Sequence, residues 1–527
     1  MKLVYDVEDR PEFGKLIVYG IQQLLAIMAA TIAVPMIIGN GMQPAAATFG
    51  AGVGTLVYIL FTKAKSPVFL GSSFAFLGSM AAAFAGAATV AAGYVGLIIG
   101  AISAGLVYVV ISYVVKKYGV AWIDKLMPKH VIGPTVAIIG LSLAGNAVGD
   151  LQNSGTGTAN ILLCVLCGLI TLAVTMCCSV YGNKTLKLIP FIVGILAGYV
   201  FAALLTVIGL LFKCEALQII NFAVFKGIKL FGVPEFTFLT AAKGFKDISF
   251  SYIISIIVAY VPVAFVVFAE HIADHKNISS IINRDLLQEP GLNRTLLGDG
   301  VGSMVGAFFG GCPNTTYGES IACVAITGNA SVASIFTCAI LAIVISFFQP
   351  FVAFINSIPS CIMGGVCMAL YGFIAVSGLK MVQKVDLENN RNLFVVSVIL
   401  IAGIGGLTLN FGAITITSIA CALILGILAN ILLSKENIKL GNLSAELSNE
   451  PIKETVKAVP QQVKITINKV VSSNAKASKK KSTAKAAKKV TNKKPAAKKT
   501  TPKKAANKPA AKAKKPASKK VNTKKSK

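Results

Sequence analysis

The sequence predicts an all-α polytopic membrane protein, and composition and the recurrence of long apolar segments both support this fold class. Of 527 residues, 55% are hydrophobic and 13% are charged, and the mean hydropathy is +0.74, values far outside the range of soluble domains. Apolar stretches of roughly 18 or more residues, long enough to cross a bilayer, recur about fourteen times between Lys15 and Ser434. We therefore expect a multi-pass membrane protein and not an enzyme.

The strong positive charge of the chain belongs to its C-terminal end. The formal net charge is +29, and residues 461–527 alone hold 24 lysines and no acidic residue. This tail lacks aromatic residues and cannot bury a core, so we expect it to be disordered, after a cytoplasmic linker over 435–460. Two roles stay open: attraction to anionic lipid, about 1 kcal/mol for each lysine near the surface, or salt-sensitive nucleic-acid binding without sequence specificity.

Lysine and arginine predict the orientation of the spans, because they are enriched in cytoplasmic loops. They fall on alternate loops, which places both termini, including residues 1–14, in the cytoplasm and the protein in the cell membrane. The acidic, polar N-terminus does not resemble a cleavable signal. The exception is the longest loop, residues 214–246, which is expected to be extracytoplasmic. The basic residues that follow the rule are Lys63, Lys65, Lys116, Lys117, Lys125, Lys129, Lys184, Lys187, Lys276, Arg284, Arg294, Lys380, Lys384 and Arg391.

The long loop divides the spans into two halves, residues 15–213 and 247–434, of about seven spans each. An odd number per half predicts an inverted repeat, which is typical of transporters. The third and tenth spans, "SPVFLGSSFAFLGS" and "GCPNTTYGESIACVAITG", are short and rich in Gly, Ser, Thr or Pro. Non-helical backbone at membrane depth survives where it is buried in protein or lines a cavity. These breaks predict a binding site, the alternative being kinked helices packed on their neighbours.

Two acidic residues within the spans are candidate site residues, since a carboxylate at the centre of a membrane helix costs roughly 2.5–3.5 kcal/mol. Glu319 lies in the broken tenth span, and Glu270 ends the apolar part of the eighth. Asp274 is one helical turn after Glu270 and shares its face, so two full negative charges there would repel. We hypothesise that Glu270 carries a proton through the transport cycle, with Asp274 as its partner. The alternative for Glu270 is an interfacial charge at the cytoplasmic end of the span.

Carboxyl groups and free backbone N–H groups in one cavity suit a neutral ligand that offers both N–H donors and carbonyl acceptors. An imide such as a nucleobase presents both, whereas an anion would favour cations or helix N-termini alone. His271 and His275 point to other sides of the helix and are left out of the site. Most of the eleven cysteines lie in apolar spans and, like Cys164 and Cys167, are expected to be packing residues. No metal site or cofactor is predicted.

Six stretches together resemble the nucleobase/ascorbate transporters (nucleobase:cation symporter 2 family), and within them the bacterial uracil permeases. They are "QQLLAIMAATIAVP", "FLGSSFAF", "AEHIADHKN", "RDLLQEPGLNRTLLGDG", "PNTTYGES" and "GGVCMALYGFIAVSGLK", and the resemblance runs from Tyr19 to Ser434. It implies a seven-plus-seven inverted repeat with core and gate domains, short antiparallel strands in the third and tenth spans, and proton-coupled uptake by alternating access.

The resemblance also implies the residues that bind the base. Glu270 and Glu319 would bind it directly, and the glutamate at 319, where many purine transporters have glutamine, favours a pyrimidine. Backbone N–H groups of Phe74 and Gly318 would meet its carbonyls, with Tyr317 and Ala30 lining the pocket. The sequence departs from the family pattern at Gln23, Asp274, Ser320 and Ala322.

The sequence therefore predicts import of a nucleobase, uracil first, by proton symport. A xanthine, urate or other purine permease of the same family stays open, as does an anion transporter sharing the architecture. The coupling ion, H⁺ or Na⁺, and the oligomeric state, including a homodimer, are not determined by the sequence.

Overall fold

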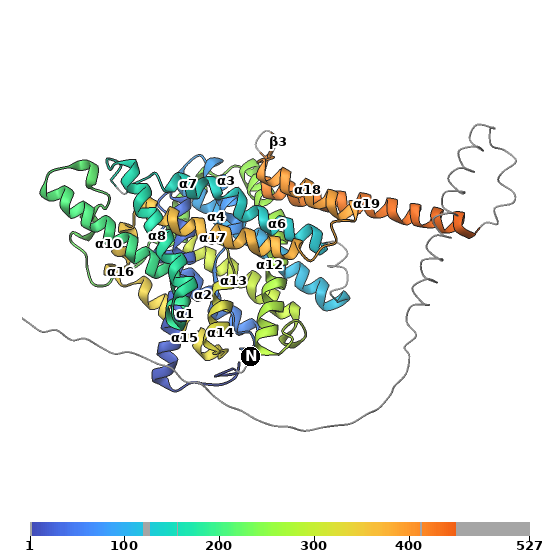
Figure 1. Ribbon diagram of the computed structural model, residues 1–527, viewed down its shortest axis with the longest axis horizontal. Coiled ribbons are helices and arrows are strands. Elements are labelled where there is room, and N and C mark those ends of the chain that lie inside the picture. Colours follow the sequence, from blue (N-terminus) through green and yellow to red (C-terminus); the bar gives the residue numbers. More distant parts are fainter. Residues whose placement is uncertain (1–2, 120–126, 155, 412–413, 450–527) are drawn as a thin grey trace, which may run out of the picture. The chain divides into compact units, whose positions relative to one another are not determined.

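The computed structural model describes residues 3–119, 127–154, 156–411 and 414–449, and these are mostly helical (Figure 1). The predicted tail, residues 461–527, lies outside the described residues. The elements of the first half are α1 (Phe13–Ile38), α2 (Pro44–Phe61), β1 (Leu70–Ser72), η1 (Phe74–Phe76), α3 (Leu77–Ala85), α4 (Val90–Tyr118), α6 (Lys129–Ser142), α7 (Ala144–Asp150), α8 (Ile161–Tyr181), α9 (Lys184–Leu188) and α10 (Pro190–Leu211).

The long loop predicted over residues 214–246 contains short helical elements, and a second series of long helices follows it. The loop elements are η2 (Glu215–Leu217), η3 (Phe222–Phe225), α11 (Thr237–Gly244) and η4 (Phe245–Asp247). The later elements are α12 (Phe250–Ile282), η5 (Leu287–Gly291), α13 (Leu292–Gly310), β2 (Asn314–Thr316), α14 (Gly318–Thr327), α15 (Val332–Ser346), α16 (Gln349–Ser357), α17 (Ser360–Val382), α18 (Asn390–Ile404), β3 (Leu409–Phe411), β4 (Ile414–Ile416) and α19 (Ser418–Asn449).

Length and composition mark many of these helices as membrane spans. Among the described residues, 8 helices are long and apolar enough to cross a membrane, and five shorter apolar helices accompany them. The glycine-rich α13 belongs to neither set. The chain is therefore a multi-pass membrane protein.

The helices pack in two groups. In the first group α13 packs on α2 and α4, α12 packs on α4, and α15 packs on α1 and α2. In the second group α17 packs on α6, α7 and α8, while α8 packs on α10 and α6 on α18. Fewer contacts join the groups, chiefly α1 with α10, α12 with α6, and α14 with α9. The first group holds both broken segments.

Small residues let α2 and α13 approach closely. A Cβ atom added to Gly50 would lie 2.3 Å from the carbonyl oxygen of Gly306, and one added to Gly54 would lie 2.7 Å from that of Gly302. Membrane helices commonly pack through small residues four apart, because lipid supplies no hydrophobic force between them. This contact positions Asn314, whose Nδ2 donates to the Gly50 carbonyl oxygen at 3.2 Å.

Two short extended segments interrupt the helices of the first group. β1 pairs with β2 in antiparallel register, with Leu70 opposite Thr316, Gly71 opposite Thr315 and Ser72 opposite Asn314. Ser73 and Tyr317 continue the pairing, since the Ser73 N–H donates to the Pro313 carbonyl and the Tyr317 N–H to the Phe69 carbonyl. Part of the backbone of the two breaks is thus satisfied by this pairing, other groups bond to the side chains of Thr55, Ser303 and Ser320, and each strand is followed by a helix start.

The N-terminal segment is held against the connection between α14 and α15. Tyr5 forms a parallel bridge with Asn329, and the buried Val7 packs in a core with residues of α12 and α14. Arg284 binds Asp6 and Glu8 at 2.7 and 3.2 Å. The Val7 backbone N–H and this guanidinium keep the pKa of Asp6 below its ordinary value. The segment thereby ties the ends of α12 and α14 together.

Candidate substrate site

One face of α12 lines a cavity near the broken segments. Glu270 and Asp274 project into a cavity of about 390 Å³, which we call the acidic cavity. Glu270 lies well inside α12, whose helix continues to Ile282. The lining residues from both helix groups are Ala26, Val136, Ser179, Lys187, Leu188, Pro190, Phe191, Glu270, Ala273, Asp274, Gly318, Glu319, Ala322, Cys323, Ile326, Leu370, Phe373, Ile374, Ser377 and Met381.

A second cavity of about 50 Å³, the inner pocket, lies where the two breaks meet. It shares Glu270, Gly318, Glu319 and Ile374 with the acidic cavity. Its other lining residues are Ser73, Phe74, Ala75, Ile139, Thr315, Thr316 and Tyr317. The two cavities together bring α12, both breaks and helices α6 and α17 of the second group around one space.

Helix starts without a side-chain cap lie at the inner pocket. α14 begins at Gly318 and η1 begins at Phe74, and neither has a side-chain hydrogen bond at its N-cap. The first N–H groups of a helix have no partner within the helix. They can therefore donate to the carbonyl oxygens of a ligand, which is the role that the sequence assigned to Phe74 and Gly318.

Hydrogen bonds separate the three carboxyl groups of the cavity into two kinds. The Asp274 Oδ2 atom accepts from the Thr316 hydroxyl at 2.7 Å, which joins α12 to β2. Among the described residues, the carboxyl groups of Glu270 and Glu319 form no hydrogen bond or ion pair with another side chain. These two groups therefore have free capacity for a ligand that donates N–H groups.

The structure brings together most of the site residues named from the sequence. Glu270, Glu319, Phe74, Gly318 and Tyr317 all line the inner pocket. Ala30 differs: it is buried on α1 and lines neither cavity, whereas Ala26, one turn earlier, lines the acidic cavity. The Tyr317 hydroxyl donates to the Ser72 carbonyl oxygen at 2.8 Å, so this side chain also braces the first break.

Two hydroxyl groups that sequence reasoning did not identify also line the inner pocket. Ser73 and Thr315 have buried hydroxyl oxygens without a hydrogen-bond partner among the described residues. Their positions in the two broken segments are the signal that could have identified them, since polar side chains beside free backbone are natural ligand contacts. Both can donate to or accept from a bound polar molecule.

The opposite face of α12 carries a buried polar cluster in which every imidazole nitrogen has a hydrogen-bond partner. The His271 Nδ1 atom bonds Asp299 Oδ2 at 2.7 Å, and its Nε2 atom bonds the Thr295 hydroxyl at 3.0 Å. His275 pairs with the Tyr58 hydroxyl at 2.7 Å and with the His271 carbonyl oxygen at 2.8 Å. Both imidazoles are fully buried. Neither histidine lines the acidic cavity or the inner pocket, which fits their exclusion from the predicted site.

Two departures from the family pattern contact each other. Gln23 of α1 donates through Nε2 to the hydroxyl and the carbonyl oxygen of Ser320 on α14. The same Ser320 hydroxyl accepts the Phe69 N–H at 3.1 Å. This buried bridge links α1, the first break and the helix that carries Glu319. Ala322 lines the acidic cavity two residues further along.

The described residues contain no group of three or more His, Cys, Asp or Glu side chains arranged to hold a metal ion. Cys164 and Cys167 are buried and unpaired, as expected for packing residues. What the arrangement offers is a pocket with two acceptor carboxyl groups, donor N–H groups at two helix starts and an apolar wall from the second helix group. It can hold a flat polar molecule that carries both donors and acceptors.

Structural comparison reveals the fold of this chain in membrane transporters. The transmembrane domain of the cyanobacterial bicarbonate transporter BicA superposes with a TM-score of 0.54, covering 80% of this chain and 97% of that one at 14% identity. The murine anion transporter Slc26a9 superposes with a TM-score of 0.57, covering 82% and 69% at 10% identity. Identity this low supports a shared fold and carries no argument about substrate.

Sequence comparison identifies the family. The profile of a family described as "Permease family" matches residues 14–411. A protein named uracil permease from Bacillus caldolyticus is 39% identical over 454 residues, covering 86% of this chain and 99% of its own. The uracil permease of Escherichia coli K12 is 35% identical over 424 residues, covering 80% and 92%. The chain therefore belongs to this permease family, the nucleobase/ascorbate transporters, and is a transporter rather than an enzyme.

Proposed function

We propose that this protein imports uracil by proton symport. The proposal rests on one combined observation. Relatives named uracil permease align over most of the chain, and two glutamates without a side-chain partner among the described residues line one pocket. Glu270 and Glu319 accept the N–H groups of the base, and the N–H groups of Phe74 and Gly318 donate to its carbonyl oxygens. Tyr317 lines the pocket, and Ala30 lies on α1 one helical turn after Ala26, which lines the acidic cavity.

The proton is carried at the carboxyl groups of α12. Glu270 faces the ligand, and Asp274 stands one turn away with its Thr316 hydrogen bond. Two like charges on one helix face repel, so protonation of one of them relieves the repulsion. Proton binding at Glu270 and uracil binding at the same group are thereby linked. Sodium in place of the proton is the alternative for the coupling ion.

We infer an architecture of fourteen spans as a seven-plus-seven inverted repeat. The first repeat covers residues 15–213 and the second 247–434, with α13 as the ninth span and the loop 214–246 outside the cell. The helix group that holds both breaks is the core domain, and the group of α6, α8, α10, α17 and α18 is the gate domain. The unequal packing within and between these groups supports a relative movement of the two.

Both termini are assigned to the cytoplasm of a cell-membrane protein, because the basic loops are grouped on that side. The linker over 435–460 begins within α19, which continues to Asn449. We assign to the tail, residues 461–527, electrostatic attraction to anionic lipid, with nucleic-acid binding as the alternative. Removal of residues 451–527 is expected to leave uptake intact.

The test is uptake of labelled uracil into proteoliposomes that contain the purified protein, under an imposed pH gradient. We expect accumulation above the external concentration when the outside is acidic, and loss of accumulation when the gradient is dissipated. A panel of unlabelled uracil, thymine, xanthine and urate identifies the preferred base by competition. Stronger competition by xanthine than by uracil would reassign the substrate to a purine.

A sodium gradient in place of the pH gradient distinguishes the coupling ion. An anion transporter is tested in the same vesicles with Glu319→Ala, because a base-binding glutamate is essential only for the nucleobase reaction. Uptake that is insensitive to Glu319→Ala would contradict the proposed binding mode.

A further inference from the structure

Three cavities lie in series along α6. Val136 lines the acidic cavity, and Ile139 lines the inner pocket. Leu143, at the C-terminal end of the same helix, lines a third cavity of about 400 Å³, which we call the distal cavity. Its other lining residues are Ile37, Ile38, Asn40, Leu77, Gly78, Ala81, Phe84, Ala85 and Asn146.

Two other elements pass the cavities in the same order. On α1, Ala26 lines the acidic cavity and Ile37 lines the distal cavity. After the first break, Phe74 lines the inner pocket and Leu77 lines the distal cavity. The distal cavity therefore lies on the far side of the inner pocket from the acidic cavity.

The material between the inner pocket and the distal cavity is one helical turn thick. Leu143, directly after α6, is four residues from Ile139, and Leu77, the first residue of α3, is three residues from Phe74 in η1. At a rise of about 1.5 Å per residue these spacings correspond to roughly 6 and 5 Å. A relative displacement of about one helical turn between α6 and the segment from Phe74 to Leu77 is enough to join the two cavities.

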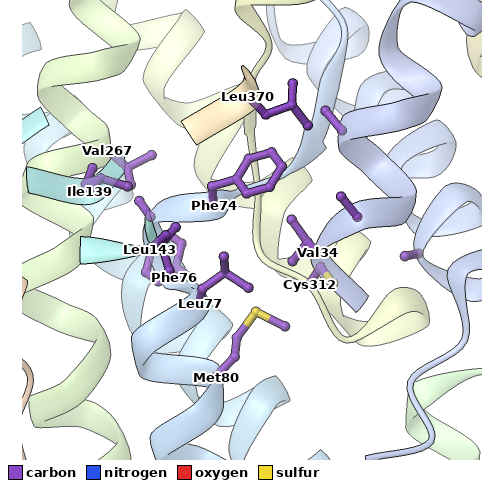
Figure 2. Close-up of a cluster of buried hydrophobic side chains, with 14 of the residues drawn as sticks. Val34, Phe74, Phe76, Leu77, Met80, Ile139, Leu143, Val267, Cys312 and Leu370 are labelled. Atoms are coloured by element: carbon purple, nitrogen blue, oxygen red, sulfur yellow. The ribbon is translucent and has the colours of Figure 1, made fainter. Parts of the chain in front are cut away.

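Four side chains lie between the inner pocket and the distal cavity, and all four are apolar and buried. Phe74, Leu77, Ile139 and Leu143 are 9%, 3%, 2% and 8% exposed and belong to one hydrophobic cluster. Figure 2 shows these side chains together, with Val34, Met80 and Leu370 nearby. Because these four side chains carry no polar group, they provide no hydrogen bond to a hydrated base that would pass between the cavities. An apolar constriction of this kind closes a path by excluding water.

The four side chains between the cavities come from both helix groups. Leu77 belongs to α3, which packs on α4 and α12, and Leu143 directly follows α6, which packs on α17 and α18. Rigid-body displacement of one group against the other therefore separates these two leucines without breaking either group. Phe74 also contacts α17 through an edge-on ring contact with Tyr371 at 5.8 Å between centroids.

We propose that Phe74, Leu77, Ile139 and Leu143 form a gate that separates the substrate pocket from the distal side of the membrane. The side chains of Leu77 and Leu143 block the leak of substrate through this gate, and transport can therefore be concentrative. This rests on the proposed function. With the gate shut, uracil bound at Glu270 and Glu319 communicates with the acidic cavity alone. Shortening either leucine joins the inner pocket to the distal cavity, so bound uracil leaks in both directions.

The test compares Leu143→Ala and Leu77→Ala with wild type in proteoliposomes. We expect each variant to bind labelled uracil within about threefold of wild type, to reach at least tenfold lower steady-state accumulation, and to release preloaded uracil at least tenfold faster. Leu296→Ala is the matched control, because it removes the same atoms from an equally buried leucine of α13 that lines none of the three cavities.

The outcomes separate the gate from the transport reaction. If wild type accumulates uracil and both gate variants accumulate and release it as Leu296→Ala does, the gate assignment is wrong. If wild type neither binds nor accumulates uracil, the proposed function itself fails.

Labelling of a cysteine gives a second readout that does not depend on uptake. Ile139→Cys, with the exposed or half-buried Cys177, Cys178 and Cys214 replaced by serine, is treated with an impermeant maleimide from the distal side. Addition of Leu143→Ala should raise the labelling rate at least tenfold. An unchanged rate would contradict the gate.

Discussion

The two faces of α12 carry ionisable residues in the same two helical turns, yet their surroundings differ completely. Glu270 and Asp274 line the acidic cavity, and the Glu270 carboxyl group has no side-chain partner among the described residues. His271 and His275 are fully buried on the other side, and each ring nitrogen has a hydrogen-bond partner. The carboxyl face thus has unfilled bonding capacity at Glu270, whereas both imidazoles of the other face are fully bonded, and the Asp299 Oδ1 atom beside them has no partner among the described residues.

This difference teaches how one helix serves both binding and stability. A buried polar group that is fully bonded holds neighbouring elements together, because removal of one partner leaves the other unsatisfied. A polar group left unpaired beside a cavity gains its partner when a ligand enters. We therefore expect substitutions on the carboxyl face to change transport and those on the histidine face to change folding.

The largest effect is expected for Glu270→Gln. Loss of the charged acceptor weakens uracil binding, because hydrogen bonds to charged groups contribute about 1.5–3 kcal/mol, and the glutamine cannot carry a proton. We expect concentrative uptake to fall about 100-fold and its increase at acidic external pH to disappear. Uptake rates at pH 6 and pH 8 provide the measurement. Retention of pH-dependent concentrative uptake would refute the proton role of Glu270.

A large loss of stability is expected for His271→Leu. This change leaves the buried Asp299 carboxyl group without its imidazole partner, and an unsatisfied buried polar group costs about 1–3 kcal/mol. The melting temperature of the detergent-solubilised protein should fall clearly. The double variant His271→Leu with Asp299→Leu should recover part of the loss, because the unsatisfied carboxyl group is gone. A single variant as stable as wild type would show that the His271–Asp299 contact does not hold α12 to α13.

A smaller effect is expected for Tyr58→Phe, which keeps the ring and removes the hydroxyl that contacts His275 and Ser66. The net value of a hydrogen bond of this kind is about 1 kcal/mol. We expect a modest decrease in melting temperature and uracil uptake within twofold of wild type. A strong decrease in uptake with unchanged stability would place the histidine face in the transport reaction.

The smallest effect is expected beyond the end of α12, for Arg284→Ala. The substitution removes the exposed ion pair between Arg284 and Asp6, which contributes less than about 1 kcal/mol to the free energy of unfolding. Because the pKa of Asp6 is lowered, its stabilisation is present above the ordinary carboxyl pKa of about 3.9 and is lost as pH falls through the folded value. The stability difference between variant and wild type should thus be small at pH 7 and smaller still at pH 3. A larger difference at pH 3 than at pH 7 would contradict the sign.

The sequence marked candidate residues where a chemical cost set them apart. Glu270 and Glu319 were identifiable because carboxyl groups are expensive within membrane spans, and the two broken segments because they are poor helices. The resemblance, rather than pattern, supplied Phe74, Gly318, Tyr317 and Ala30. Of these six residues, all but Ala30 line the inner pocket.

What the sequence could not predict depends on contacts between distant segments. Asp299 was overlooked within the glycine-rich α13, although an acidic residue in such a helix was itself a signal. Its pairing with His271, and that of His275 with Tyr58, follow from how α12, α13 and α2 pack. The contact between Gln23 and Ser320 shows the same limit, since two departures that look independent in the chain form one hydrogen-bonded bridge.

The central claim, that the carboxyl face of α12 binds the substrate and the histidine face does not, is tested most directly by equilibrium binding of labelled uracil to two purified variants, Glu270→Gln and His275→Gln. We expect Glu270→Gln to weaken binding by about 10- to 100-fold, the equivalent of 1.5–3 kcal/mol, and His275→Gln to bind uracil within threefold of wild type. Equal weakening by both, or a larger loss for His275→Gln, would contradict this account.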